Sequence, residues 1–340
     1  MLTTPTRRQF IRAAAASAVA ASVKVKAQTV NRDDLLAIPK AGRVRVVLDT
    51  DTYNEIDDQY AVAYSLLSPE RLSVEAIYAA PFVNYRSSSA AQGMEKSYEE
   101  ILRLLKFFKR VDPSIAHQGS NRFFQQRDRP VDSPAARDLI ERALKPGPGP
   151  LYVLAIGCPV NVSSAIVMEP KIKEKIVVVW LGGTPHYWPS AKEFNLQQDV
   201  MASQLLFDSG VALVQIPTKN VSEHLRTTVP ELEKYLRGRS RLGDYLYGQF
   251  LEYAAVHIDD RGLGDNYPWS KVIWDISAVA WLNNPEWVPS EIVPSPILTD
   301  NMRWERAAGR HTIRAATNVN RDPVFNDVFS RLSRLDEQAR

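Results

Sequence analysis

The stretch VVLDTDTYNEIDD, residues 46–58, decides how this chain folds and where its chemistry lies. An apolar strand runs directly into four aspartates, which are Asp49, Asp51, Asp57 and Asp58. Carboxylates on one turn repel each other and raise each other's pKa, so such a cluster usually needs a bound cation. Carboxylate oxygens are the ligands that Ca²⁺ and Mg²⁺ prefer. A solvated acidic turn is the weaker interpretation, because the apolar strand adjoins Asp49 and a helical pattern follows Asp58.

The rest of the chain alternates between predicted strands and predicted helices. We expect strands at 44–48, 74–79, 151–156, 176–181 and 211–216, and helices at 59–67, 94–109, 134–144, 276–282 and 323–335. The strands at 151–156 and 176–181 are apolar on both faces, which is typical of parallel strands with helices on both sides. This order predicts an α/β fold, with an open, mostly parallel sheet flanked by helices and a site at the strand carboxyl ends. From residue 262 onward the Pro and Trp content predicts loops over these ends before the last helix.

The first 27 residues have the pattern of a twin-arginine export signal. Arg7-Arg8 is followed by Phe10, an apolar run over residues 13–23 and a small-residue cleavage pattern that ends at Ala27. The apolar run is too short to span a bilayer as an anchor. We therefore predict a signal peptide over residues 1–27 and a single domain over residues 28–340. The expected location is periplasmic or secreted, with no membrane anchor after cleavage.

Removing the predicted signal changes the charge of the chain. The whole sequence carries a net charge of +3, and residues 1–27 contain five basic and no acidic side chains. Subtracting those five positive charges leaves −2 for residues 28–340. This balance gives no support for binding to nucleic acid or to an anionic membrane. Cys158 is the only cysteine, which excludes an intrachain disulfide.

The aspartate pattern resembles the amino-terminal signature of the nucleoside hydrolases. This family cleaves the N-glycosidic bond of ribonucleosides with a tightly bound Ca²⁺. Its two halves are matched by Asp49-Thr50-Asp51 and by Ile56-Asp57-Asp58. The linker between Asp51 and Asp57 is two residues longer here than the family's usual one. The resemblance covers roughly residues 44–335 and implies the nucleoside-hydrolase fold. The family is often oligomeric, which leaves a homo-oligomer open.

Two further segments follow the family in order and spacing. The run 155–161, AIGCPVN, resembles the turn in which a backbone carbonyl binds the calcium, and Val160 occupies that place. A carbonyl ligand needs no particular side chain, so valine is chemically suitable. Gly182-Gly183 followed by Glu193-Phe194-Asn195 resembles the run whose Glu and Asn hydrogen-bond the ribose 5′-hydroxyl.

The pair Trp274-Asp275 resembles the carboxy-terminal motif of the family. The resemblance implies that Asp275 is the last metal ligand and also reaches the ribose 3′-hydroxyl. Trp274 matches the tryptophan that stacks on the base in the purine-preferring branch, where other members have a histidine. It favours purine nucleosides, although a core or rim aromatic is the alternative interpretation. Asn84 falls where the family places a ribose-contacting Asn, and a turn-forming Asn is an equally good interpretation.

The resemblance also implies a mechanism. The implied Ca²⁺ ligands are Asp51, Asp58, the Val160 carbonyl and Asp275, with Asp49 in a supporting role. Asp51 would be the general base, removing a proton from a water whose pKa the cation lowers. Asp57 and Asp275 would hold the 2′- and 3′-hydroxyls, and their charge would stabilise the cationic sugar of the transition state. The group that protonates the departing base stays open, with His186 and His257 as candidates.

Two other functions remain open at this point. The longer linker favours a related hydrolase that acts on a different ribosyl or glycosyl substrate. A protein that binds sugar with Ca²⁺ but does not turn it over is the other alternative. The complete aspartate set, together with Glu193 and Asn195, argues against the second, since every group needed to activate water is present.

Overall fold

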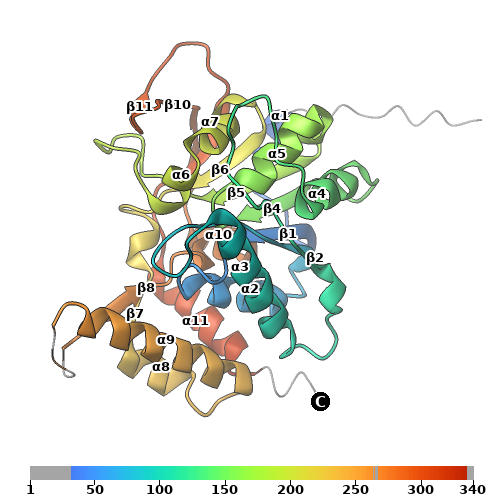
Figure 1. The fold of residues 1–340 in the computed structure, drawn as a ribbon. Helices are drawn as coiled ribbons and strands as arrows, with labels where there is room; N and C mark the ends of the chain where they lie inside the picture. Colours follow the sequence, from blue (N-terminus) through green and yellow to red (C-terminus); the bar gives the residue numbers. More distant parts are fainter. Residues whose placement is uncertain (1–31, 263, 265–266, 335–340) are drawn as a thin grey trace, which may run out of the picture.

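An eight-stranded sheet forms the centre of the fold (Figure 1). The computed structural model describes residues 32–262, 264 and 267–334. The predicted signal peptide over residues 1–27 lies outside the described residues. The strands lie in the order β3 (Ala116–His117), β2 (Leu72–Ala79), β1 (Val44–Thr50), β4 (Leu151–Ala155), β5 (Ile176–Leu181), β6 (Ala212–Ile216), β12 (Thr312–Ala316) and β9 (Ser290–Pro294). Neighbouring strands are parallel except β9, which is antiparallel to β12. The predicted fold class is confirmed.

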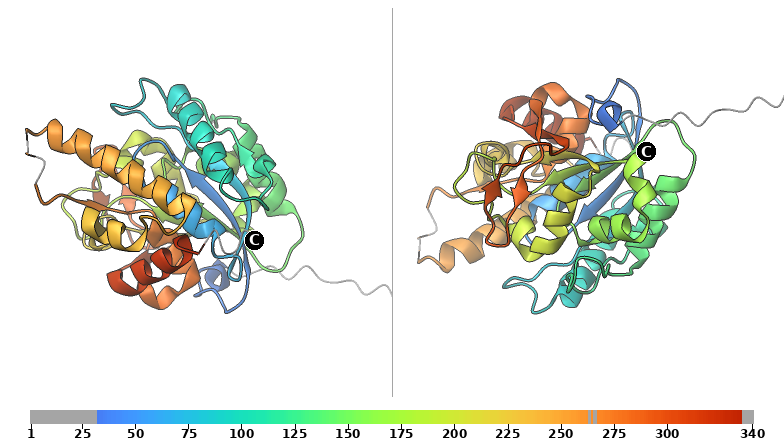
Figure 2. Two further views of the ribbon diagram at one scale, coloured as in Figure 1. Left: turned by 90° about the horizontal axis from the view of Figure 1, so that it is seen from below. Right: turned by 90° about the horizontal axis from the view of Figure 1, so that it is seen from above.

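Helices cover both faces of this sheet, as the views in Figure 2 show. On one face lie α2 (Asp57–Leu66), α3 (Ala90–Leu105), α10 (Ile276–Asn283) and α11 (Arg321–Leu332). On the other lie α4 (Pro134–Leu144), α5 (Val160–Met168) and α7 (Val200–Asp208). Successive residues of one strand point into the two different cores, so Val46 and Leu48 pack with the first layer and Val47 with the second. Each strand is therefore apolar on both sides, which is the pattern in the sequence.

Smaller elements complete the chain around this sandwich. The two-stranded ribbons are β7 (Arg226–Thr228) with β8 (Ser270–Val272), and β10 (Ile297–Leu298) with β11 (Trp304–Glu305). The remaining helices are α1 (Arg32–Leu35), α6 (Phe194–Gln198), α8 (Val229–Tyr235) and α9 (Arg241–Asp259). Helices α8 and α9 lie beside β7 and β8, as the orange segments of Figure 1 show. No helix within the described part of the chain is long and apolar enough to cross a membrane.

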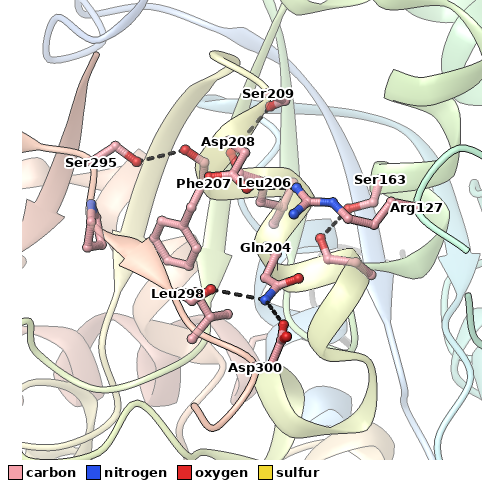
Figure 3. A network of polar contacts seen from close by, with 12 residues as sticks. Arg127, Ser163, Gln204, Leu206, Phe207, Asp208, Ser209, Ser295, Leu298 and Asp300 are labelled. Atoms are coloured by element: carbon pink, nitrogen blue, oxygen red, sulfur yellow. Dashed lines mark hydrogen bonds and ion pairs between the residues drawn. The ribbon is translucent and has the colours of Figure 1, made fainter. Parts of the chain in front are cut away.

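Polar contacts tie α7 to the segment that contains β10 (Figure 3). The Gln204 amide donates to the Leu298 carbonyl at 3.0 Å and to the Asp300 carboxylate at 2.8 Å. The Ser295 hydroxyl donates to the Phe207 carbonyl at 2.8 Å. Helix α6 directly precedes α7 in the chain. The contacts of α7 therefore also help to hold α6, which begins at Phe194, in place.

The carboxy-terminal third differs from the sequence prediction. Loops were expected from residue 262 onward, but β12 and β9 are strands of the main sheet. Their pattern is obscured because Arg314 lies within β12, where its guanidinium donates to the Leu36 and Ser290 carbonyls. Pro294 ends β9, where a proline is tolerated since β9 is the last strand of the sheet.

Candidate active site

The aspartates of the opening stretch meet at the carboxyl end of β1. Strand β1 lies between β2 and β4, where the chain order of the sheet reverses. Open α/β sheets bind ligands at such a point. One carboxylate oxygen each from Asp57, Asp58 and Asp275 lies within 4.8 Å of the others, and all three residues are buried. The structure therefore brings together in one acidic cluster residues that lie more than 200 positions apart in the sequence.

Asp51 is buried beside this cluster. Within the described residues, neither of its carboxylate oxygens has a hydrogen-bond partner. Burial raises its pKa well above the ordinary value, and the charges of Asp58 and Asp57 raise it further. A buried carboxylate without partners is costly to ionise unless a cation lies beside it. The environment of Asp51 thus suits the role of metal ligand that the sequence predicts for it. Asp51 is not one of the three residues whose carboxylate oxygens lie within 4.8 Å of one another.

Asp58 and Asp275 are held by different elements. The Thr50 hydroxyl donates to Asp58 at 2.5 Å, which fixes the orientation of that carboxylate at the start of α2. Burial and the charge of Asp57 raise the pKa of Asp58 to about 8. Asp275 directly precedes α10, and burial followed by the charges of Asp58 and Asp57 raises its pKa strongly. These carboxylates offer only oxygen ligands, and their negative charges repel one another. Such a set of ligands suits a hard cation such as Ca²⁺ or Mg²⁺.

The turn between β4 and α5 lies against Asp51. A Cβ added at Gly157 would lie 3.1 Å from the Asp51 carboxyl carbon, so this glycine allows the close approach. Val160 is buried and begins α5. The next residue, Asn161, donates to the Asp49 carboxylate at 2.7 Å and to the Ala79 carbonyl at 3.2 Å. Burial raises the pKa of Asp49 to about 7. Asp49 therefore joins β1 to α5, which is a supporting role.

A cavity of about 280 Å³ opens onto the acidic cluster. Six predicted site residues line it, which are Asp57, Asp58, Glu193, Asn195, Trp274 and Asp275. Asn54, Glu55, Leu181, Lys192, Phe194, Thr218 and Lys219 complete the wall. Two larger hollows, of about 650 and 540 Å³, lie elsewhere, and neither is lined by Asp57, Asp58 or Asp275. We place the site in the smaller cavity because carboxylates, a tryptophan and polar side chains converge there.

Hydrogen bonds to the backbone fix Glu193 and Asn195, the two residues predicted to contact the sugar 5′-hydroxyl. Glu193 precedes α6 and accepts from the Gly183, Asn195 and Leu196 amides at 2.9 to 3.1 Å. Burial raises the pKa of Glu193 to about 7, while these hydrogen bonds oppose the shift. The Asn195 amide donates to the Ile156 and Leu181 carbonyls. Both residues are thereby held at the ends of β4 and β5.

Asn84 occupies a different place from the other predicted substrate contacts. Its amide donates to the Asn54 side chain at 2.6 Å, and its side-chain oxygen accepts from the Arg86 amide. It is absent from the described lining of the cavity. These contacts show that Asn84 holds the turn between Asp51 and Asp57.

Comparison with known proteins identifies the family. The sequence model for the inosine-uridine preferring nucleoside hydrolase matches residues 46–326. The chain belongs to this nucleoside hydrolase family. It is therefore a hydrolase of N-glycosyl bonds, and the family acts on small nucleoside substrates. The predicted resemblance is confirmed.

Individual relatives of this nucleoside hydrolase differ in their substrates. A pyrimidine-specific ribonucleoside hydrolase, RihA, from Escherichia coli O9:H4 is 26% identical over 270 residues, covering 71% of this chain and 80% of the relative. RihA from Klebsiella pneumoniae is 25% identical over 253 residues, covering 68% and 77%.

Solved structures of nucleoside hydrolases share the fold. A plant enzyme, PpNRh1, has a TM-score of 0.68 at 20% identity, covering 85% of this chain and 99% of its own. The purine-preferring enzyme from Gardnerella vaginalis has a TM-score of 0.67 at 21% identity, covering 86% and 99%. These likenesses concern the fold alone.

The two histidines left open as acids lie in different places in this nucleoside hydrolase. His186 lines the 540 Å³ hollow and pairs through Nε2 with the Gln215 side chain at 2.7 Å. His257, on α9, stacks on the Tyr253 ring, with the ring centroids 4.0 Å apart. Neither is part of the described wall of the aspartate cavity.

No role was predicted from the sequence for two residues that lie beside the aspartates, Glu55 and Lys271. Glu55 lines the cavity, accepts from the Tyr253 hydroxyl at 2.8 Å and pairs with Lys271 at 2.5 Å. Lys271 is buried and lies 3.4 Å from Asp57. A lysine in a short strand normally faces solvent, so only its position four residues before Asp275 could have drawn attention to it.

Proposed function

We propose that this chain hydrolyses ribonucleosides with the help of a bound Ca²⁺ and favours purine nucleosides. The observation that carries the proposal is the single cavity into which carboxylates, polar side chains and Trp274 project. A nucleoside has a polar sugar and an aromatic base, and the cavity offers a matching surface to each. The family match supports the reaction, and the acidic cluster supports the metal.

The residues present fit a cation. Asp51 has two buried oxygens without partners in the described chain, and the neighbouring trio of carboxylates lies within 4.8 Å. Asp51, Asp58 and Asp275 would hold the ion, together with the carbonyl of Val160. When bound, Ca²⁺ would lower the pKa of a nearby water and offset the repulsion among the carboxylates.

The carboxylates would then carry out the hydrolysis of the N-glycosidic bond. Asp51, which lacks a hydrogen-bond partner of its own in the described residues, would accept the proton of the attacking water. Asp57 and Asp275 would accept hydrogen bonds from the sugar hydroxyls. Their negative charge would stabilise the positive charge that develops on the sugar as the bond to the base breaks.

The proposed base preference rests on Trp274. This residue is partly buried, and its backbone amide donates to Asp57 at 3.2 Å, which sets the indole at the cavity wall. Stacking on an aromatic ring favours the larger purine surface. The RihA relatives are pyrimidine-specific, which supports pyrimidine nucleosides as the second candidate substrates.

A substrate panel tests the proposal. We expect ribose release from inosine, guanosine and adenosine by the chain from residue 28, at higher kcat/KM than from uridine and cytidine. EDTA should abolish the activity, and Ca²⁺ should restore it. Faster release from uridine would favour the pyrimidine candidate. Absence of turnover on all five substrates with Ca²⁺ bound would overturn the proposal. It would favour either a hydrolase that acts on another glycoside or a protein that binds sugar without turning it over.

Replacing Trp274 by Ala tests the stacking role. We expect KM for inosine to rise about tenfold or more, since stacking of a base on an aromatic side chain contributes roughly 1–3 kcal/mol. KM for uridine should change less, because a pyrimidine presents a smaller face. Steady-state kinetics with both substrates measure the two KM values. An equal rise in KM for inosine and uridine would show that Trp274 only shapes the cavity.

A further inference from the structure

A buried cation lies directly behind the acidic wall of the cavity. Lys271 is 7% exposed, and it and Arg314 are the only buried basic residues in the described chain. The Arg314 guanidinium donates to the backbone carbonyls of Leu36 and Ser290, at 2.8 and 3.0 Å. Burying a lysine charge is costly unless acidic partners surround it, so the position of Lys271 requires an explanation.

Lys271 has a full set of partners. Its ammonium lies 2.5 Å from Glu55 Oε2, 3.0 Å from the Val272 carbonyl and 3.4 Å from Asp57 Oδ1. It also lies 5.6 Å from the centroid of the Tyr253 ring. Three acceptors satisfy the three protons of an ammonium group. Lys271 therefore has no proton left for a ligand, and it acts on the cavity through Glu55 and Asp57.

The longer linker between Asp51 and Asp57 supplies the first of these partners. Glu55 lies in that linker, and its other oxygen accepts from the Tyr253 hydroxyl on α9. The Arg86 guanidinium donates to the Glu55 carbonyl at 3.1 Å. The linker is thus held from three sides, and its one acidic side chain is neutralised by Lys271. Glu55 from the linker and Lys271 from β8 therefore add one negative and one positive charge to the site, leaving its net charge unchanged.

The contact with Asp57 connects this arrangement to the sugar. Asp57 Oδ2 accepts from the Trp274 amide at 3.2 Å, and Oδ1 faces Lys271. Strand β8 carries Lys271 and continues directly into Trp274 and Asp275, so one segment supplies the cation, the aromatic wall and an acid. Without Lys271, Asp57 would face the like charge of Glu55 as well as the other aspartates.

We propose that Lys271 is a positioning residue that keeps the Asp57 carboxylate oriented as an acceptor for a sugar hydroxyl, and so sets the preference for ribonucleosides over 2′-deoxyribonucleosides. This inference rests on the proposed function, since it needs a nucleoside in the cavity. Substrates that lack the hydroxyl held by Asp57 gain nothing from Lys271. Ribonucleosides gain a hydrogen bond to a charged group.

The test compares the Lys271→Met variant with the wild-type chain on inosine and 2′-deoxyinosine. We expect KM for inosine to rise about 10- to 100-fold, the factor for one hydrogen bond to a charged group. KM for 2′-deoxyinosine should change less than threefold, so the preference between the two substrates collapses. A Lys271→Arg variant should restore part of the preference, because it keeps the charge.

A matched control separates positioning from general stability. Arg45→Met removes another part-buried cation that pairs with a carboxylate, Glu75, at 2.7 Å near the opposite end of β1. It should lower the melting temperature without changing the preference between the two substrates. An equal loss on both substrates in Lys271→Met, or a fall in its Ca²⁺ affinity by titration calorimetry, would overturn the inference. A wild-type chain inactive on all five ribonucleosides of the substrate panel would instead refute the proposed function.

Discussion

Replacing Asp51 by Asn is expected to lower kcat on the best nucleoside by about 10²- to 10⁴-fold, the range for loss of a general base. Asn keeps the size of the side chain but cannot accept a proton from water at neutral pH. Binding of the nucleoside should persist, since the hydroxyl-binding carboxylates Asp57 and Asp275 remain. The measurement pairs steady-state kinetics with equilibrium binding of the same nucleoside to the variant.

A second variant separates the two roles proposed for Asp51. Asp49→Asn changes a carboxylate on the same strand end, whose bonded oxygen accepts from Asn161. An amide oxygen can accept that hydrogen bond too, so this change should cost less than tenfold. If high Ca²⁺ restores the turnover of Asp51→Asn, Asp51 serves only to hold the ion, and the assignment of the base is wrong.

The sheet was largely predictable because its strands are short apolar runs. Strand β5 and helix α4 have the predicted bounds, and β1 extends two residues beyond them, to Thr50. Helix α2 begins at Asp57, two residues earlier than the apolar pattern predicted. A helix can begin with polar residues, and acidic side chains suit its first turn. Apolar periodicity cannot locate such a start.

The acidic cluster was predictable and its surroundings were not. Asp51, Asp57 and Asp58 lie close together in the sequence, and the family motif adds Asp275 from the far end of the chain. Lys271 reaches them only because β8 pairs with β7, a contact between short strands without a strong pattern. Its ion pair with Glu55 joins residues 216 positions apart, which no local rule detects.

The stability of the metal-free chain is expected to fall as the pH rises from 6.5 to 8. Burial raises the pKa of Asp58 to about 8 and those of Asp49 and Glu193 to about 7, all above the ordinary carboxyl values near 4. The folded chain therefore binds protons that the unfolded chain has already lost, and each such group lowers the free energy of unfolding by up to about 1.4 kcal/mol per pH unit. The pKa of His186 is lowered by burial, so its opposing contribution is confined to lower pH.

Calcium should reverse this trend, because the ion binds the ionised carboxylates and displaces their protons. We expect the melting temperature in EDTA to fall between pH 6.5 and 8, and the increase produced by Ca²⁺ to grow over the same interval. Thermal melts measured by circular dichroism, with and without EDTA, make the comparison. Asp58→Asn provides the control, since it removes a carboxyl group whose pKa burial raises to about 8 and should flatten the slope in EDTA. A metal-free melting temperature that rises with pH, or a Ca²⁺ effect that shrinks, would show that the cluster is not a proton-linked cation site.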